Sequence, residues 1–236
     1  MRKNILVISA AILSLVGVSE SWATTGCVKD GSYVRCYNAS GKQIFSLTGN
    51  SYTCSGNSCS TNTGDTINYN PSTNQISERK CRSHSSGVCT RYLSASFRNQ
   101  DYTYDEQGNQ ISIRTCLTVN TDGSCNGYSS GSDYTYDPTT GKQTSSRSCN
   151  SVNTDGSCNG YSGGTYYTYD PTTGNQTSYK ECGNYSSSGE CLMYTYATNT
   201  TYDENGKARS HKGCYFETIN TSQGECISYA FGSDYI

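Results

Sequence analysis

Cysteines that recur in close pairs constrain this chain more than any other feature. The first cysteines of the last five pairs are 35, 33, 33 and 32 residues apart, and a fixed period of this length is typical of repeat proteins. An even number of cysteines in an exported chain predicts disulfides and no thiolate metal site. We therefore expect seven local disulfides: Cys27–Cys36, Cys54–Cys59, Cys81–Cys89, Cys116–Cys125, Cys149–Cys158, Cys182–Cys191 and Cys214–Cys226.

Two kinds of turn alternate along each repeat. Between cysteine pairs lie segments such as 136–141 (YDPTTG), in which Asp bonds its own backbone, Pro presets φ and Gly supplies a left-handed exit. Between the two cysteines of a pair lie segments such as 120–124 (NTDGS). In the last four turns of the first kind, a cysteine follows eight residues after the Gly, counted from Gly108, Gly141, Gly174 and Gly206. This constant register is typical of hairpins, so each repeat is predicted to contain two strands and two turns.

The composition indicates a fold without an ordinary aliphatic core. From Thr24 onward, Leu, Ile, Val, Met and Phe account for 22 of 213 residues, whereas the chain has 22 tyrosines. Each disulfide closes a loop of about ten residues and is worth about 2.5–3 kcal/mol in the chain-entropy model. We expect an all-β fold of tandem β-hairpin repeats of about 33 residues, stapled by local disulfides. The repeats would form an antiparallel meander or an open β-solenoid.

The first residues have the three-part pattern of a secretory signal peptide. Arg2 and Lys3 precede an apolar run over residues 5–18, and small residues at Ser21 and Ala23 precede the expected cleavage site. The apolar run is shorter than the roughly 20 residues that span a bilayer. Cleavage removes two basic residues and one acidic residue, which changes the net charge from −2 to −3. This charge does not indicate a nucleic-acid partner.

These features divide the chain into four parts. We expect a signal peptide at 1–23, N-terminal capping hairpins at 24–66, tandem β-hairpin repeats at 67–213 and a C-terminal capping hairpin at 214–236. The mature protein is expected to be secreted, at the cell surface or in the periplasm, with no membrane span.

Alternation along the strands predicts two different faces. Two residues before the first cysteine of each of the last five pairs stands a cation, and we call these cations the basic row: Arg79, Arg114, Arg147, Lys180 and Lys212. Tyrosines three residues after the second cysteine, such as Tyr128, Tyr161 and Tyr194, are expected on the opposite face if no bulge intervenes. Tyr167 and Tyr179 are expected on that tyrosine face too.

Three segments resemble the tyrosine–aspartate (YD) repeats of Rhs and teneurin-type surface proteins. They are 102–108 (YTYDEQG), 134–141 (YTYDPTTG) and 167–174 (YTYDPTTG), and the resemblance covers about residues 67 to 210. It implies successive β-hairpins of a large spiralling sheet at a cell surface. The present units differ from that family because each carries a cysteine pair.

Repeated cations and tyrosines suggest a polymer ligand. Cations on every second strand would lie about 9.5 Å apart and would suit an acidic polysaccharide. The alternative is a solvated basic face that keeps the sheet soluble. The tyrosine face either stacks on sugar rings or is buried against another layer or chain. The candidate polymer-binding residues are Arg79, Arg114, Arg147, Lys180, Lys212, Tyr128, Tyr161 and Tyr194.

No pattern indicates catalysis or a metal site. The turns of type NTDGS offer three oxygens, but turn chemistry explains them without calcium. His84 and His211 are the only histidines and lie in non-equivalent places. We therefore expect a non-enzymatic, exported structural or adhesive protein with no cofactor and no metal. The alternative is a carbohydrate-binding module, and the expected partners are extracellular polysaccharide or further copies of the chain.

Overall fold

The structure is a computed structural model that describes residues 25–93 and 99–235. The expected signal peptide at 1–23 lies outside these residues. The described chain is almost entirely β-strand, with one short 3-10 helix, η1 (Phe216–Thr218). Within the described ranges, no helix has the length and apolar character needed to cross a membrane.

The N-terminal strands form a separate small sheet. Its three antiparallel strands are β1 (Gly26–Asp30), β2 (Tyr33–Tyr37) and β3 (Gln43–Thr48). Cys27 lies directly opposite Cys36 in this sheet, so the first disulfide links β1 to β2.

Most of the remaining chain forms one antiparallel sheet of 13 strands. Its strands, in spatial order, are β4 (Tyr52–Ser55), β5 (Ser58–Thr61), β6 (Thr66–Asn70), β7 (Gln75–Arg79), β10 (Gln100–Tyr104), β11 (Gln110–Val119), β12 (Cys125–Tyr136), β13 (Gln143–Cys149), β14 (Tyr161–Tyr169), β15 (Gln176–Tyr185), β16 (Cys191–Tyr202), β17 (Ala208–Tyr215) and β20 (Phe231–Asp234). Each strand pairs with its neighbours along the chain, apart from the separate hairpins β8–β9 (Cys81–Ser85, Val88–Tyr92) and β18–β19 (Ile219–Asn220, Glu225–Cys226). Because β4 and β20 are the two edges, the sheet is an open meander. The predicted all-β fold class is confirmed.

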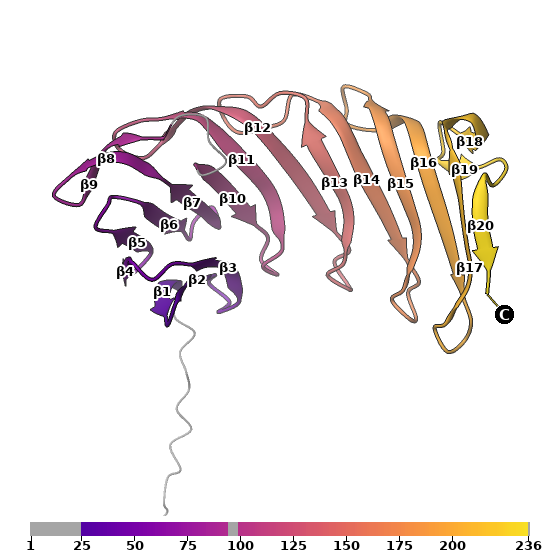
Figure 1. Cartoon of the computed structure of the whole chain (residues 1–236), viewed down its shortest axis with the longest axis horizontal. Helices are drawn as coiled ribbons and strands as arrows, with labels where there is room; N and C mark the ends of the chain where they lie inside the picture. The colour runs from indigo at the N-terminus through magenta and orange to yellow at the C-terminus, as the bar shows by residue number, and fades with distance from the viewer. Residues whose placement is uncertain (1–24, 94–98, 236) are drawn as a thin grey trace, which may run out of the picture.

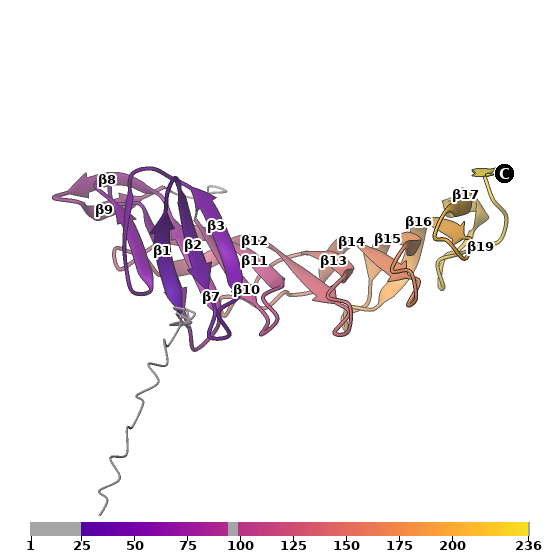
Figure 2. The ribbon, with the colours of Figure 1, turned by 90° about the horizontal axis from the view of Figure 1, so that it is seen from below.

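The long sheet is curved, and the small sheet covers one end of its concave side. Figure 1 shows the curve, and Figure 2 shows β1, β2 and β3 lying across the underside of the first strands of the long sheet. The main apolar cluster lies between these layers and includes Val34, Ile44, Ile67, Ile76 and Tyr104, all at most 7% exposed. Aliphatic burial is therefore concentrated at the N-terminal end. Beyond β11, another source of cohesion is needed.

Disulfides between neighbouring strands supply part of that cohesion. All 14 cysteines form disulfides, each with the other member of its predicted pair, from Cys27–Cys36 to Cys214–Cys226. The closed loops are short, with sequence separations of 5 to 12 residues. The fold is thus stapled locally, as an all-β repeat with few aliphatic residues requires.

The tyrosine–aspartate turns link each repeat to the one before it. The Asp137 carboxylate accepts hydrogen bonds from the backbone and hydroxyl of Thr140 and from the Thr139 backbone, which build the turn and lower the pKa of Asp137. The preceding Tyr136 hydroxyl donates to the carbonyl oxygen of Gln110 at 3.0 Å. Two further repeats have the same contact, in the pairs Tyr169–Gln143 and Tyr202–Gln176, both at 2.9 Å. In these three motifs, Asp shapes the turn and Tyr bonds the preceding hairpin.

The predicted boundaries between the four parts of the chain stay predictions. The separate sheet ends at Thr48 and the long sheet begins at Tyr52. The 66/67 boundary lies inside β6, and the 213/214 boundary lies inside β17.

Candidate functional site

A β-bulge in three repeats moves a tyrosine onto the face of the basic row. In β11 and β12, Thr115 lies opposite Ser130, yet Cys116 lies opposite Tyr128, so Ser129 is an extra residue. Such a bulge reverses the alternation of side chains along the strand. The bulge recurs in two further strand pairs, where the extra residues are Ser162 and Thr195. The expectation that Tyr128, Tyr161 and Tyr194 face away from the basic row is therefore wrong.

The cation and the tyrosine of one repeat together hold the glycine turn of the next. Arg114 Nε donates to the carbonyl oxygen of Gly156 at 2.6 Å. A Cβ on Gly156 would lie 3.5 Å from the Tyr128 ring, so the turn packs against that ring. We call this arrangement an inter-repeat clasp. The four clasps are Arg79 and Tyr92 around Gly123, Arg114 and Tyr128 around Gly156, Arg147 and Tyr161 around Gly189, and Lys180 and Tyr194 around Gly224.

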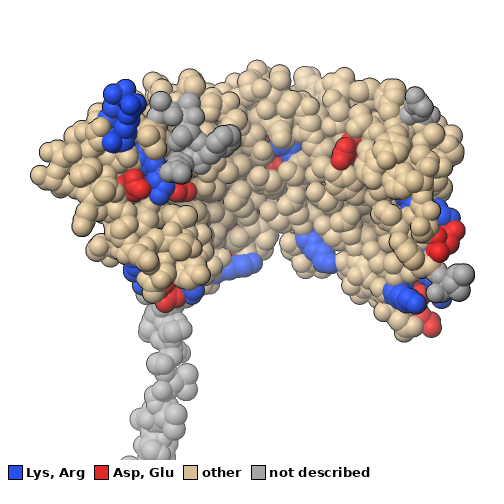
Figure 3. Space-filling view, viewed as in Figure 1, with Lys and Arg blue, Asp and Glu red and all other residues tan. Residues whose placement is uncertain are grey.

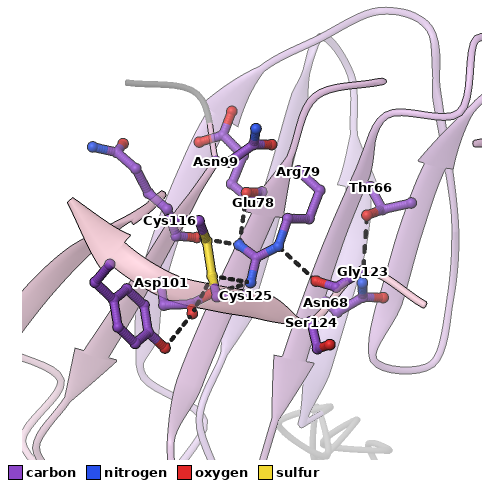
Figure 4. Close-up of polar contacts among 12 residues, drawn as sticks. Thr66, Asn68, Glu78, Arg79, Asn99, Asp101, Cys116, Gly123, Ser124 and Cys125 are labelled. Atoms are coloured by element: carbon purple, nitrogen blue, oxygen red, sulfur yellow. Dashed lines mark hydrogen bonds and ion pairs between the residues drawn. A yellow bond between two sulfur atoms is a disulfide. The ribbon is translucent and has the colours of Figure 1, made fainter. Parts of the chain in front are cut away.

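Two of the clasps contain an ion pair. Arg79 Nη2 lies 2.6 Å from Asp101 Oδ1, and Arg114 Nη2 lies 2.5 Å from Asp133 Oδ1. Figure 4 shows the Arg79 guanidinium between Asp101, the Gly123 carbonyl and the Cys116–Cys125 disulfide. Arg79 is 2% exposed and Arg114 is 7% exposed. These two members of the basic row are thus internal, and their guanidinium groups do not form part of an open cationic surface.

The same aspartates also bond the tyrosine of the following clasp. Tyr128 donates to Asp101 Oδ2 at 3.0 Å, and Tyr161 donates to Asp133 Oδ2 at 2.6 Å. Burial, together with the negative charge of Asp101, raises the pKa of Tyr128 to about 12. Burial and the hydrogen bond to Asp133 also raise the pKa of Tyr161. Each aspartate therefore couples two successive clasps and holds the tyrosine neutral.

The later repeats lack these aspartates. In the sheet register, Asp101 and Asp133 lie opposite Ser77 and Ser112 of the preceding strand, and the next equivalents are Tyr166 opposite Ser145 and Asn199 opposite Ser178. Within the described residues, neither Arg147 nor Lys180 has an ion pair. Lys212, the last cation of the row, pairs with Asp234 at 2.9 Å.

Arg147 and Lys180 line a shared groove on this face. The groove has a volume of about 430 Å³. It lies between β13 and β15, and Tyr166 and Tyr194 contribute to its lining. Both cations are partly exposed. Within the described residues, Arg147 and Lys180 are the members of the basic row that are partly exposed and form no ion pair.

A row of aromatic rings lies on the opposite face of the long sheet. Adjacent ring centroids in this aromatic row are 5.5 to 5.9 Å apart in the pairs Tyr167–Tyr179, Tyr179–Tyr196 and Tyr196–Tyr215, and Phe231 packs on the last two tyrosines. By register, this is the face that the small sheet covers at the N-terminal end, where Phe45 packs on Tyr102 at 5.5 Å. Alternation predicted Tyr167 and Tyr179 here, whereas Tyr196 and Tyr215 were missed. Both lie an odd number of residues from a cysteine, which was the available signal.

The clusters of acids with cysteines do not fit a metal ion. Asp101 lies near Cys116 and Cys125, and Asp133 lies near Cys149 and Cys158. Both cysteine pairs are disulfides, so the sulfurs have no thiolate to offer a metal. In the turn at 120–124, Asp122 accepts hydrogen bonds from the backbone and hydroxyl of Ser124, which account for the turn geometry.

Comparisons with known proteins give a weak structural resemblance. No protein-family model matches the chain, and no curated protein matches it. Among solved structures, "Crystal Structure of TcdB2-TccC3-Cdc42" is similar at 13% identity and a TM-score of 0.31. The match covers 86% of this chain and 10% of that chain, so this chain spans about a tenth of the length of its structural neighbour.

Proposed function

We propose that this chain is an exported, non-enzymatic repeat protein that acts as a structural or adhesive component of a cell surface or extracellular space. The inter-repeat clasps are the observation that carries this proposal. Each clasp connects side chains of one repeat to a turn 42 to 44 residues further along the chain. A curved sheet held in this way is cohesive without a second layer over most of its length, and it presents repeated positions along one direction.

The disulfides support an oxidising compartment. Fully bonded cysteines in an all-β chain with few aliphatic residues are typical of secreted and surface proteins. Charged side chains are sparse on the face seen in Figure 3, which suits a surface that contacts polymers through hydroxyls and rings.

The histidines support a non-enzymatic role. His84 is exposed on β8, in the separate β8–β9 hairpin, whereas His211 lies on β17 and its Nδ1 is 2.9 Å from the Thr200 hydroxyl. The two are therefore in different structural settings, and neither belongs to the basic row or the clasps.

Surface labelling and adhesion together test the proposal. Cells that express the full chain are treated with a membrane-impermeant lysine reagent, and adhesion to polysaccharide-coated surfaces is compared with that of cells from which the coding sequence is deleted. We expect labelling of the mature chain on intact cells and weaker adhesion after deletion. Labelling only after lysis, together with unchanged adhesion, would reject the surface role.

A second candidate function is binding of acidic polysaccharide, and one observation favours it. Arg147 and Lys180 line an open groove and lack the carboxylates that neutralise Arg79 and Arg114. This candidate is compatible with an adhesive role, because adhesion needs a ligand.

A further inference from the structure

We number the repeats that contain Asp101, Asp133 and Tyr166 as the first, second and third, and the third differs from the other two at one position of the basic face. Asp101 and Asp133 occupy this position in the earlier repeats, where each accepts from an arginine and a tyrosine. Tyr166 occupies it in the third repeat, opposite Ser145 on one side and Lys180 on the other. The substitution removes a carboxylate and keeps the cation that the carboxylate would neutralise.

Arg147 consequently has unused hydrogen-bonding capacity. Its Nη1 reaches the Gly189 carbonyl at 3.3 Å, and its guanidinium lies over the Tyr161 ring at 4.3 Å. Its Nε is buried and has no hydrogen-bond partner, whereas the Nε atoms of Arg79 and Arg114 donate at 2.7 and 2.6 Å. A buried donor without an acceptor is costly, so Arg147 is held less completely than Arg79 and Arg114.

The Tyr185 hydroxyl is buried near Arg147. Both it and the Arg147 side chain flank Gly164, and burial and the neighbouring Tyr166 hydroxyl raise the pKa of Tyr185. In the described residues, Arg147 Nε is a buried donor without an acceptor, unlike the Nε atoms of Arg79 and Arg114. Native structures satisfy most buried donors, so the clasp around Gly189 is less complete than the clasps around Gly123 and Gly156.

Lys180 supplies a second cation with free donors. Its Nζ donates to the Gln223 carbonyl at 2.9 Å and lies 5.6 Å from the Tyr194 ring centroid. An ammonium group has three donors, so one bond to a carbonyl leaves two. Lys180 and Arg147 line the same groove, whose other lining includes the hydroxyl residues Thr135, Thr144, Ser145, Thr168 and Ser178.

The acids around the groove leave it positive. Asp133 lies opposite Arg147 in the sheet, but both of its oxygens are engaged, by Arg114 and by Tyr161. Glu225 lines the neighbouring hollow with Lys180, without an ion pair between them. The groove is therefore lined by two cations, Arg147 and Lys180, and among the described residues the Glu225 carboxylate at its edge is the one nearby acid that is not already paired.

We propose that the groove between Arg147 and Lys180 binds the carboxylate or sulfate groups of an acidic polysaccharide. The guanidinium and ammonium groups would bond the anion, and the surrounding hydroxyls and the Tyr166 and Tyr194 rings would contact the sugar. This inference rests on the proposed adhesive function, because it names the ligand class of that function. A hydroxyl-lined groove with two cations, in a chain of net charge −2, favours a polysaccharide over a nucleic acid.

Three charge-matched variants of the full mature chain test the groove. In Tyr166→Asp/Asn199→Asp, the acids of the earlier repeats are introduced beside Arg147 and Lys180. In Arg147→Gln/Lys180→Gln, the cations are removed. In Arg91→Gln/Lys207→Gln, two exposed cations outside the groove are removed as a control. All three lower the net charge by two, so bulk electrostatics affects them equally.

Binding is measured to immobilised polygalacturonate, which carries carboxylates, to dextran sulfate and to neutral dextran, at low and high salt. We expect wild type to bind one or both acidic polymers but not dextran, and we expect both groove variants to bind at least about tenfold more weakly. The control should change binding less than about twofold. The polymer that binds identifies the anionic group.

The Tyr166→Asp/Asn199→Asp variant also serves as the control for correct folding. Because the introduced carboxylates recreate the pairing of the earlier repeats, we expect its unfolding temperature to stay at or above that of wild type. Loss of binding in a variant that is not destabilised assigns the effect to the groove.

Several results would overturn the inference. Equal weakening in all three variants would indicate bulk charge, and no weakening in the groove variants would place binding elsewhere while leaving the adhesive function intact. Absence of wild-type binding to either acidic polymer would reject the ligand class, and stronger binding to a single-stranded oligonucleotide would reject the choice of polysaccharide. Surface labelling and the deletion assay test the adhesive function separately from these outcomes.

Discussion

Arg114 Nε donates a hydrogen bond to the carbonyl oxygen of Gly156, 42 residues further along the chain, at 2.6 Å. The same guanidinium pairs with Asp133 on the adjacent strand. One side chain therefore holds its own hairpin together and fixes the turn of the next repeat. Contacts of this kind explain how a long sheet with few aliphatic residues coheres.

Arg114→Met tests the energetic weight of a clasp. Removal of one partner of a largely buried ion pair leaves Asp133 uncompensated, so we expect the free energy of unfolding to fall by about 3–5 kcal/mol. Arg114→Met/Asp133→Asn should lose less than the sum of the single changes, because no charge is then left unpaired. Urea unfolding measures all three. Arg82→Met, at an exposed position on β8, should change stability by less than about 0.5 kcal/mol. Equal effects at both arginines would contradict the clasp.

Two adjacent glycines on β14 offer a test of packing. A Cβ on Gly164 would lie 2.6 Å from the Ser146 carbonyl oxygen and 3.0 Å from Arg147 Cγ, whereas a Cβ on Gly163 would meet only the Cys182 carbonyl oxygen at 3.9 Å. We expect Gly164→Ala to destabilise the protein by about 1–3 kcal/mol. Gly163→Ala should be neutral or slightly stabilising, because it restricts the unfolded chain. Thermal unfolding compares them, and a larger loss at Gly163 would reject this packing.

Tyr169→Phe tests the bond that links successive tyrosine–aspartate turns. The hydroxyl donates to the Gln143 carbonyl at 2.9 Å, and its loss should cost about 1 kcal/mol. Tyr229→Phe serves as the control, because Tyr229 is 53% exposed and its hydroxyl has no hydrogen bond in the described structure. Chemical denaturation should separate the two variants. Indistinguishable midpoints would mean that water replaces the inter-repeat bond without loss.

Removal of one disulfide tests local stapling. Cys149→Ser/Cys158→Ser opens a loop with a sequence separation of nine residues, which the chain-entropy model values at about 2.5–3 kcal/mol. We expect a stability loss of that size and retention of β-rich circular dichroism, because the remaining repeats keep their own disulfides. Peptide mapping by mass spectrometry without reduction checks the pairing in wild type. A linkage between distant repeats would contradict it.

The raised pKa of Tyr128 predicts that the folded protein loses stability at alkaline pH. Its pKa is raised from 10.0 to about 12 by burial and by Asp101, so folding favours the neutral phenol. That contribution is complete below pH 10 and is lost as the pH rises from 10 toward 12. Unfolding free energies measured on both sides of pH 10 should therefore decline above it, and Tyr128→Phe should reduce the decline. An unchanged pH profile in the variant would show that Tyr128 does not titrate with folding.

The strands, hairpins and local disulfides could be predicted because each depends on residues close together in sequence. A turn such as 136–141 specifies its own geometry through Asp and Gly, and a pair such as Cys116–Cys125 closes a loop of about ten residues. The tyrosine of the turn motif was recognisable, but its acceptor in the preceding hairpin was not. That contact depends on how two hairpins lie side by side.

The faces of the sheet required the tertiary structure. One extra residue, Ser129, places Tyr128 beside Arg114, and simple alternation cannot locate such a bulge, since a shift of one residue exchanges the two faces. The availability of each cation depended on still more distant residues. Arg114 is neutralised by Asp133, whereas Tyr166 occupies the equivalent register position in the strand beside Arg147. Only the pairing of strands that are distant in sequence sets these positions. Local sequence thus decides the repeat, because turns and short loops act over a few residues. The register between strands decides which charges stay open to a ligand, because it sets the long-range pairing of side chains.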